Sequence, residues 1–255
     1  MILAIDVGNT NIVLGCIDDE KIINIVRLHT DLHATSAEYA IRIRQILDLY
    51  EIDGGGFSGA ILSSVVPPVT GTLTAAIKKV TGLDCMVVGP GMKTGMNVRI
   101  DDPGTLAADL VVASVAAITY YGAPAIVLDM GTANTMVVID KNGAYRGGAI
   151  TPGVKLSYEA LASAASLLPD ISLGAPKKVI GTNTVDAMRS GAIFSTAGAI
   201  DSMVDRMEEE LGYPCNLVAT GGLARFITPY CRRAFVCDND LLLKGLWVLY
   251  RKNLK

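Results

Sequence analysis

The sequence lacks the patterns that mark several common classes of protein. It contains no G-x-x-x-x-G-K-[ST] phosphate-binding loop, and its 22 Lys and Arg residues form no run among the 25 Asp and Glu residues. A formal net charge of −3 offers no electrostatic footprint for nucleic acid. We therefore expect no nucleic-acid partner, and any use of a nucleotide must rest on another scaffold.

Cysteine and histidine are also few. The five cysteines are odd in number and include no C-x-x-C pair, which favours reduced, structural thiols over disulfides or a zinc site. The two histidines, His29 and His33, have no accompanying cluster of cysteines or carboxylates. They are therefore interpreted as polar surface residues rather than metal ligands.

The sequence pattern indicates neither a leader nor a membrane span. Met1 opens directly into an apolar run, so we expect no signal or transit peptide and a cytoplasmic location. The uncharged stretch 110–128 has the length of a membrane span, but Gly122-Ala123-Pro124 interrupts it. This stretch is predicted to be a helix followed by a buried strand, and no membrane partner is expected.

A repeated motif is the strongest positive signal in the sequence. Residues 6–11 (DVGNTN) and 129–134 (DMGTAN) share the spacing of a carboxylate, a glycine and an asparagine, and each lies between apolar runs. Each copy predicts a strand, a tight turn and a second strand. Glycine lets backbone N–H groups approach phosphate oxygens, Asn and Thr add donors, and Asp can hold a cation or its water shell. One copy alone would be an ordinary hairpin, whereas two copies favour phosphate binding in two similar halves.

The rest of the sequence alternates between helix and strand patterns, as in an α/β protein. The first half predicts a β meander to about residue 28, then helices and strands in alternation over 36–50, 60–66, 70–80 and 85–88, with Ser36 as the first N-cap. The second half repeats this order and ends with a helix over 240–250. With 51% hydrophobic residues the chain can form large cores. We expect two related domains, residues 1–114 and 115–255.

A glycine pair late in the chain completes a recognisable set. Thr220-Gly221-Gly222-Leu223-Ala224 follows an apolar strand, and with the two hairpins it resembles the actin-like, hexokinase and Hsp70 superfamily of ATP-binding proteins. The resemblance implies two duplicated, ribonuclease H-like domains whose hairpins hold the phosphates of ATP from opposite sides of an interdomain cleft. The glycine pair would admit the adenosine against bare backbone, because a side chain would fill that space. A plain strand-to-helix turn is the alternative interpretation of Gly221 and Gly222.

Six short motifs narrow the resemblance, and they keep their order from one end of the chain to the other. They are residues 6–10 (DVGNT), 64–68 (SVVPP), 129–133 (DMGTA), 147–153 (GGAITPG), 181–184 (GTNT) and 240–246 (DLLLKGL). In this order they resemble the type III pantothenate kinases, which phosphorylate pantothenate with ATP in the first step of coenzyme A synthesis. The same resemblance implies Mg²⁺ and a monovalent cation, K⁺ or NH₄⁺, as further cofactors.

The resemblance also assigns roles around the nucleotide. Asp6 would act on magnesium and the triphosphate, and Asp129 is the carboxylate expected near the monovalent cation. The residues expected to bind ATP and its phosphates are Asp6, Gly8, Asn9, Thr10, Asn11, Gly131, Thr132, Gly221 and Gly222. Phosphoryl transfer requires mainly charge neutralisation and positioning, with a base for the attacking hydroxyl, and these residues would supply the first two.

The base of this family comes from a G-x-D-R motif, which aligns with Ala107-Ala108-Asp109-Leu110. Asp109 is retained and is the expected catalytic residue. Its neighbours on both sides are apolar, so burying this carboxylate would be costly without a purpose. The alternative is an exposed carboxylate in the first turn of a helix, favoured there by the helix dipole.

Three departures from the family pattern gather around this motif, at positions expected to bind the acid substrate. Leu110 replaces an arginine expected to meet the pantothenate carboxylate, Ala107 replaces a glycine and Ile100 replaces a tyrosine. Loss of a charge-assisted hydrogen bond of this kind costs about 1.5–3 kcal/mol. Arg99 or Lys155 is a candidate for the missing positive charge.

Phosphorylation of pantothenate is the leading expectation, and three alternatives stay open. The chain could be a divergent subunit that completes the site of a homologue, since Thr184 matches a family threonine that reaches the substrate across a dimer interface. Thr184 is accordingly a fourth expected substrate-binding residue, in a homodimer or a heterodimer. The second alternative is a kinase for an uncharged acceptor. The third is a nucleotide-dependent binding module on the same fold, because a fold does not determine a function.

Overall fold

The structure, a computed structural model, describes residues 1–254 and divides into two compact units. The first unit holds residues 1–95, 101–116 and the chain from Asp240 onward, and the second holds residues 96–100 and 117–239. The boundary expected at 114/115 lies close to residues 116 and 117, where the chain passes from the first unit to the second. The closing helix, however, belongs with the first unit rather than with the second, because it packs on the first sheet.

The first unit is built on a mixed sheet with the strand order β3-β2-β1-β4-β5. Its strands are β1 (Ile2–Val7), β2 (Asn11–Asp18), β3 (Lys21–His29), β4 (Gly59–Ser64) and β5 (Cys85–Val87). The antiparallel ladder of the first three strands confirms the predicted meander, and β4 and β5 add in parallel. The turn between β2 and β3 uses positive φ angles of 41° at Asp19 and 72° at Glu20.

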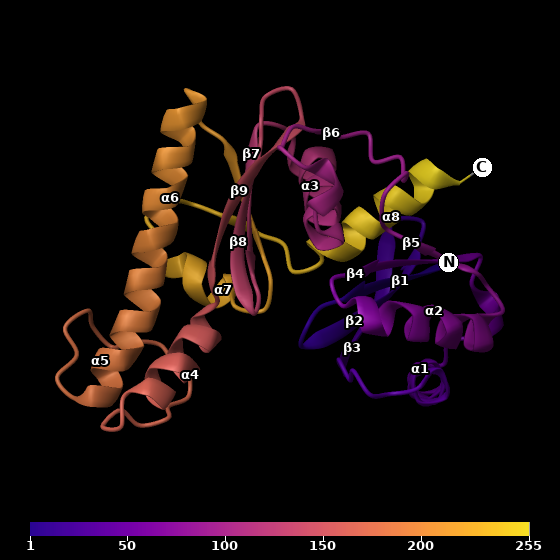
Figure 1. The fold of residues 1–255 in the computed structure, drawn as a ribbon, viewed down its shortest axis with the longest axis horizontal. Helices are drawn as coiled ribbons and strands as arrows, with labels where there is room; N and C mark the ends of the chain where they lie inside the picture. Colours follow the sequence, from indigo (N-terminus) through magenta and orange to yellow (C-terminus); the bar gives the residue numbers. More distant parts are fainter. Residues whose placement is uncertain (255) are drawn as a thin grey trace. The chain divides into compact units, whose positions relative to one another are not determined.

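Two helices, α1 (Ser36–Leu49) and α2 (Pro67–Thr81), cover one face of this sheet (Figure 1). The N-cap of α1 is Thr35 rather than the predicted Ser36, because the Thr35 and Glu38 side chains form a reciprocal capping box. Helix α2 begins three residues earlier than predicted, at Pro67, whose fixed φ suits the first helical position.

The opposite face of the first sheet carries α8 (Leu241–Asn253). Two glycines make this contact close. A Cβ at Gly15 in β2 would lie 2.8 Å from Leu243 Cδ1, and one at Gly59 in β4 would overlap the ring of Tyr250. The sequence-distant helix is thus seated directly on the strands, which explains why it belongs to the first unit.

The second unit repeats the plan of the first. Its sheet has the order β11-β10-β7-β8-β9-β6, with β7 (Ala125–Met130) central as β1 is in the first sheet. The other strands are β6 (Asn97–Val98), β8 (Ala133–Ile139), β9 (Ala144–Pro152), β10 (Asn216–Thr220) and β11 (Val236–Cys237). Strands β1 and β7 share one burial pattern, in which four buried residues precede a partly exposed Asp and a further buried residue.

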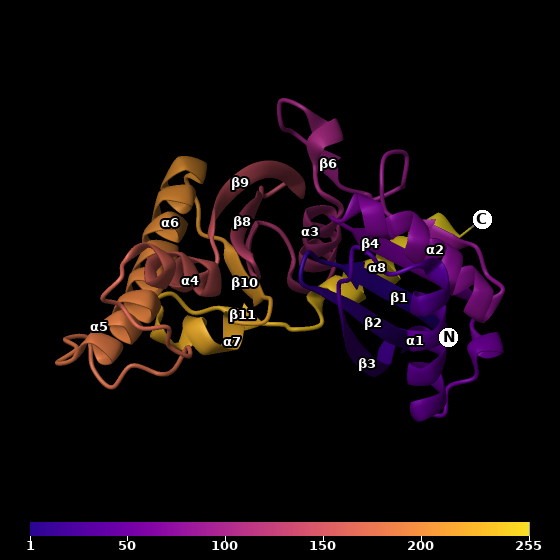
Figure 2. The same ribbon diagram turned by 60° about the horizontal axis from the view of Figure 1, so that its bottom comes forward.

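Helices of the second unit gather on one face of its sheet, as the two views in Figures 1 and 2 agree. They are α4 (Val154–Ala164), α5 (Thr184–Ser190), a π-helical turn (Gly191–Ser195), α6 (Thr196–Leu211) and α7 (Ala224–Ile227). Helix α3 (Ala108–Tyr121) begins in the first unit and ends in the second. Short 3₁₀ turns occupy Gly54–Gly56, Pro103–Thr105 and Thr228–Tyr230.

The apolar stretch 110–128 forms most of α3 and most of β7, as the sequence predicts. Among residues 1–254, no helix has both the length and the hydropathy that crossing a membrane requires.

Replacement of Leu128 tests the core of the second unit. Leu128 is 0% exposed in β7, so Leu128→Ala is expected to lower the free energy of unfolding by about 2–5 kcal/mol through lost burial and a cavity. Leu49 is 76% exposed, and Leu49→Ala is the control, expected to change the same quantity by less than about 0.5 kcal/mol. Urea denaturation measures both, and equal effects would contradict this description of the core.

Candidate functional site

The first repeated motif forms a tight turn between β1 and β2. Asp6 is the last residue but one of β1, and the Gly8 N–H donates to the Asn11 carbonyl at 2.9 Å. Asn9, Thr10 and Asn11 are exposed. The turn therefore offers polar side chains and backbone to a ligand at the end of a buried strand.

Thr30 supports this turn, and the sequence analysis missed it. This threonine is buried, its Oγ1 donates to the Gly8 carbonyl at 2.7 Å, and its N–H donates to the Thr10 carbonyl at 3.0 Å. Its position directly after β3, a strand that pairs with β2, was the available signal. The turn is held at two carbonyls before any ligand binds.

The second motif forms the corresponding turn between β7 and β8. Asp129 is the last residue but one of β7, and the Gly131 N–H donates to the Ala133 carbonyl at 3.0 Å. Gly153 packs against this turn, since its N–H donates to the Thr132 carbonyl at 3.0 Å and a Cβ there would overlap that carbonyl. In the sequence Gly153 is one residue of a family motif, and the structure shows that it supports the turn.

Strand pairing brings the late glycine motif to Asp129. Thr220 lies beside Asp129 in the parallel ladder of β10 and β7, and Gly221 follows with a φ of 92°. A Cβ at Gly221 would lie 2.5 Å from Asp129 Oδ1 and 2.6 Å from the Met130 nitrogen. Gly222 has open space at the same position, with no heavy atom within 4 Å. Gly221 is thus required by close approach, whereas Gly222 leaves room beside the backbone.

The duplication extends to a pair of buried hydroxyl groups. Ser63 lies beside Asp6 in the ladder of β4 and β1, as Thr220 lies beside Asp129. Both residues are 0% exposed, and among residues 1–254 neither hydroxyl has a hydrogen-bond partner. In-register neighbours on parallel strands point to the same face of a sheet, so each hydroxyl accompanies its carboxylate. An unsatisfied buried hydroxyl costs about 1–3 kcal/mol, and the water shell of a bound cation would supply a partner.

Asp109 lies in the first turn of α3 and is partly buried. The Leu110 N–H donates to its Oδ1 at 2.8 Å. Burial raises the pKa of the Asp109 carboxyl, and this outweighs the opposing effect of the hydrogen bond from Leu110. The alternative interpretation places Asp109 in the first turn of a helix and exposed to solvent. The structure agrees on the helical turn, but the carboxylate is partly buried.

The expected acid-substrate residues fall in both units. Ala107 and Leu110 flank Asp109 in the first unit, and both are partly buried. Ile100 belongs to the second unit, where its Cγ2 lies 3.8 Å from the position that a Cβ at Gly147 would occupy.

Thr184 is the exposed first residue of α5 and lines a cavity of about 740 Å³ in the second unit. Asn183 caps the helix, since its side chain accepts a hydrogen bond from the Asp186 N–H at 2.8 Å. Tyr158 also lines the cavity, and its buried hydroxyl has no hydrogen-bond partner among residues 1–254. Thr184 therefore borders a cavity with an unsatisfied polar group.

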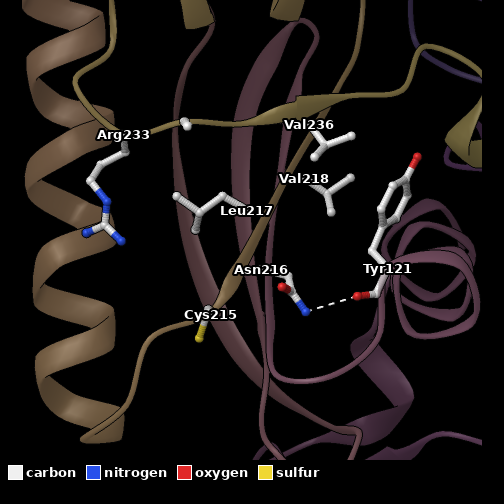
Figure 3. A pocket seen from close by; sticks show the side chains of 8 residues that line it. Tyr121, Cys215, Asn216, Leu217, Val218, Arg233 and Val236 are labelled. Carbon is white, nitrogen blue, oxygen red and sulfur yellow. Dashed lines mark hydrogen bonds between the residues drawn. The ribbon is translucent and has the colours of Figure 1, made fainter.

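A second cavity of about 410 Å³ lies beside β10 and β11 and contains none of the expected site residues (Figure 3). Its polar groups are already engaged. Tyr121 donates from its hydroxyl to Asp238 at 2.7 Å, and Arg233 forms ion pairs with Asp205 and Glu208. Burial, with the Asp238 carboxylate, raises the pKa of the Tyr121 hydroxyl. These contacts hold the elements together and leave little to recognise a ligand.

Solved structures define the class to which this fold belongs. The (R)-2-hydroxyglutaryl-CoA dehydratase component A of Acidaminococcus fermentans is similar at a TM-score of 0.58 and 14% identity, covering 98% of this chain and 96% of that chain. The ROK hexokinase of Thermus thermophilus is similar at a TM-score of 0.51 and 12% identity, covering 98% and 99%. The fold is that of the actin-like ATPases and sugar kinases.

Sequence relatives identify the family within this class. The model of the type III pantothenate kinase family matches residues 2–206. The type III pantothenate kinase of Halalkalibacterium halodurans is 44% identical over 253 residues, which are 99% of this chain and 100% of that protein. The chain belongs to the type III pantothenate kinase family, a family of phosphotransferases that use ATP.

The two adjacent glycines at the end of β10 allow a matched test. Gly221→Ala is expected to lower the free energy of unfolding by about 2–3 kcal/mol, because Gly221 has a φ of 92° and a Cβ would press on Asp129. Gly222→Ala has open space and no positive φ, so its unfolding free energy is expected to stay within about 0.5 kcal/mol of the parent. Guanidinium denaturation compares the two, and a reversed order would refute the assigned close approach.

Proposed function

We propose that this chain transfers the γ-phosphoryl group of ATP to pantothenate, forming 4′-phosphopantothenate in the first step of coenzyme A biosynthesis. The observation that carries the proposal is that a chain of this family, matched over nearly its whole length, contains the carboxylate-and-glycine turn twice in the same structural setting. The direct test is ATP-dependent phosphorylation of pantothenate by the purified protein with Mg²⁺ and K⁺ present. A folded protein without this activity would refute the proposal.

The two turns are the proposed phosphate-binding elements. In the first unit the exposed Asn9, Thr10 and Asn11 would donate to phosphate oxygens, and Gly8, whose N–H is engaged with the Asn11 carbonyl, would let the phosphates approach the turn closely. In the second unit Thr132 would donate to phosphate, and Gly131, whose N–H is engaged with the Ala133 carbonyl, would allow the same close approach. The open space at Gly222 suits contact between adenosine and bare backbone. Gly221 lacks such space, because it packs closely against Asp129.

The carboxylates fit hydrated cations better than a protein-only metal cage. No group of three or more His, Cys, Asp or Glu side chains that could hold a metal is found within residues 1–254. Mg²⁺ is often bound by one or two carboxylates, phosphate oxygens and water, and the unsatisfied hydroxyls of Ser63 and Thr220 suit such water. We assign Asp6 to Mg²⁺ and Asp129 to the monovalent cation. When bound, Mg²⁺ neutralises charge on the triphosphate.

Asp109 is the proposed general base for the pantothenate hydroxyl. A base works best when its pKa lies near the working pH, and burial shifts the pKa of this carboxyl upward. The hydrogen bond from the Leu110 N–H to Oδ1 fixes one oxygen, which leaves Oδ2 to accept the proton. The remaining catalysis comes from positioning the two reactants.

The carboxylate of pantothenate needs a cation in place of the family's arginine. Of the two candidates, Arg99 is exposed and forms no ion pair with another described residue. Its backbone N–H donates to the Tyr145 carbonyl at 2.9 Å, which fixes the position of its main chain. Lys155 is already paired with Glu159 at 3.7 Å. We assign the role to Arg99, with Ala107, Leu110 and Ile100 providing apolar contacts to the substrate.

Thr184 supports a proposed homodimer in the cytoplasm, in which this threonine would reach the substrate of the other protomer. Large apolar side chains are exposed along and near the cavity that Thr184 lines, and exposed apolar patches of this kind mark interaction sites. These side chains are Leu161, Leu167, Val179 and Ile180, which are 48%, 92%, 63% and 78% exposed.

Asp109→Asn tests the base. The substitution keeps the hydrogen-bond acceptor for Leu110 but removes the proton acceptor, so kcat is expected to fall about 10²- to 10⁴-fold. The parent enzyme is expected to lose activity as the pH falls through the raised pKa of Asp109, at a higher pH than an ordinary carboxyl would allow. The pH dependence of kcat measures both, and an unchanged acidic limb in the Asn variant would exclude Asp109.

The same variant, Asp109→Asn, is predicted to increase stability although it lowers activity. The folded-state pKa of Asp109 is raised above its unfolded value, so ionisation of the carboxyl destabilises the folded protein at neutral pH. At pH values above the folded-state pKa, Asp109→Asn is therefore expected to raise the Tm. This gain in Tm is expected to shrink as the pH falls toward the pKa of the unfolded state. Thermal unfolding at several pH values checks this, and a lowered Tm at neutral pH would contradict the assigned burial.

Arg99→Ala tests the cation that binds the acid. Loss of a charge-assisted hydrogen bond of about 1.5–3 kcal/mol is expected to raise KM for pantothenate about 10- to 150-fold with little change in KM for ATP. Lys155→Ala is the matched control and is expected to leave both values near those of the parent. Steady-state kinetics measures both KM values in both variants. A raised KM for pantothenate in Lys155→Ala but not in Arg99→Ala would assign the role to Lys155.

A further inference from the structure

One glycine in α8 allows that helix to touch the helix that carries Asp109. Gly245 is buried, and a Cβ at this position would overlap the carbonyl oxygen of Val112 in α3. The same Cβ would lie 2.8 Å from Val112 Cγ1. The obstacle is mainly backbone, which cannot move aside as the end of a flexible side chain can. Only glycine permits this separation of the two helices.

The contact lies one helical turn from the proposed base. Val112 follows Asp109 by three residues, so the two occupy neighbouring turns on the same side of α3. Val112 is itself 0% exposed. A shift of the backbone at Val112 would therefore move the first turn of α3 and the carboxylate that it carries.

The other side of α8 contacts the sheet that carries the first phosphate turn. Leu243, two residues before Gly245, lies over Gly15 of β2. Gly15 pairs with Ala4, which precedes Asp6 by two residues in β1. Tyr250, further along α8, lies over Gly59 and donates to the Ser58 carbonyl at 3.3 Å. All of these residues belong to the first unit, so α8 links the Asp6 turn to Asp109 through one continuous set of contacts.

We propose that Gly245 is a positioning residue, which sets the place of Asp109 relative to the Asp6 turn by fixing the separation of α8 and α3. The inference rests on the proposed function, since it takes Asp109 to be the base. The short reach of proton transfer makes the rate sensitive to displacements of about 1 Å, for which losses near 10²-fold are typical.

Gly245→Ala is the test, with Gly71→Ala as the matched control. Gly71 is also a helical glycine of the first unit, but nothing lies within 4 Å of its Cβ position. In Gly245→Ala, kcat is expected to fall about 100-fold, KM for ATP to change less than threefold, and the acidic limb of the kcat profile to move. Gly71→Ala is expected to leave all three unchanged. Parent-like kcat and pH limb in a folded Gly245→Ala protein would overturn the proposal.

A double variant separates positioning from general damage. If Gly245 acts through Asp109, Gly245→Ala added to Asp109→Asn is expected to cause less than a threefold further loss, because the base is already gone. A further loss near 100-fold would overturn the proposal and assign Gly245 to general structure. If Asp109→Asn itself kept full activity, the proposed function of Asp109 would fail first, and the two failures are thus distinguishable.

Val112→Ala keeps the proposal testable if Gly245→Ala does not fold. This substitution removes the Cγ1 atom that faces Gly245 and loosens the same contact from α3 without a clash. We expect kcat to fall several-fold with KM for ATP unchanged and with the same displacement of the acidic limb. A folded Val112→Ala protein with a parent-like limb would overturn the proposal.

Discussion

Each sheet of this protein has to hold a partly exposed carboxylate at the end of a strand whose preceding residues are buried. Asp6 and Asp129 occupy this position in β1 and β7, and both strands have the same burial pattern. The core on either side of the strand fixes its register, because a shift by one residue would turn the apolar side chains toward water. The burial of its neighbours therefore fixes where along the strand the carboxylate lies.

Close backbone contacts then decide what surrounds each carboxylate. Gly221 and Gly153 hold the second turn, and each would overlap a neighbour if it carried a Cβ. The first turn is held instead by a buried side chain, Thr30, which donates to two carbonyls. The two halves thus reach similar turns through different supports. A site held in advance by such contacts loses little entropy on binding, which suits a reaction that depends on positioning.

The sequence alone predicted the alternating α/β order, both turns and the helix that carries Asp109, because these follow from local periodicity and from the residues that tight turns require. The N-cap at Thr35 and the start of α2 at Pro67 differ by one and three residues from the prediction. Such ends depend on which side chain reaches a backbone donor, which periodicity does not report.

What the sequence by itself determined is the duplicated motif, its turn chemistry and the family to which the chain belongs. What only the tertiary structure decided is which distant residues accompany the motif: the hydroxyls of Ser63 and Thr220, the support from Thr30, and the place of α8 in the first unit. The physical reason is that strand register and helix contacts join residues far apart in the chain. In the case of Gly245, the sequence shows a glycine inside a helix, and only the position of Val112 shows why no other residue fits.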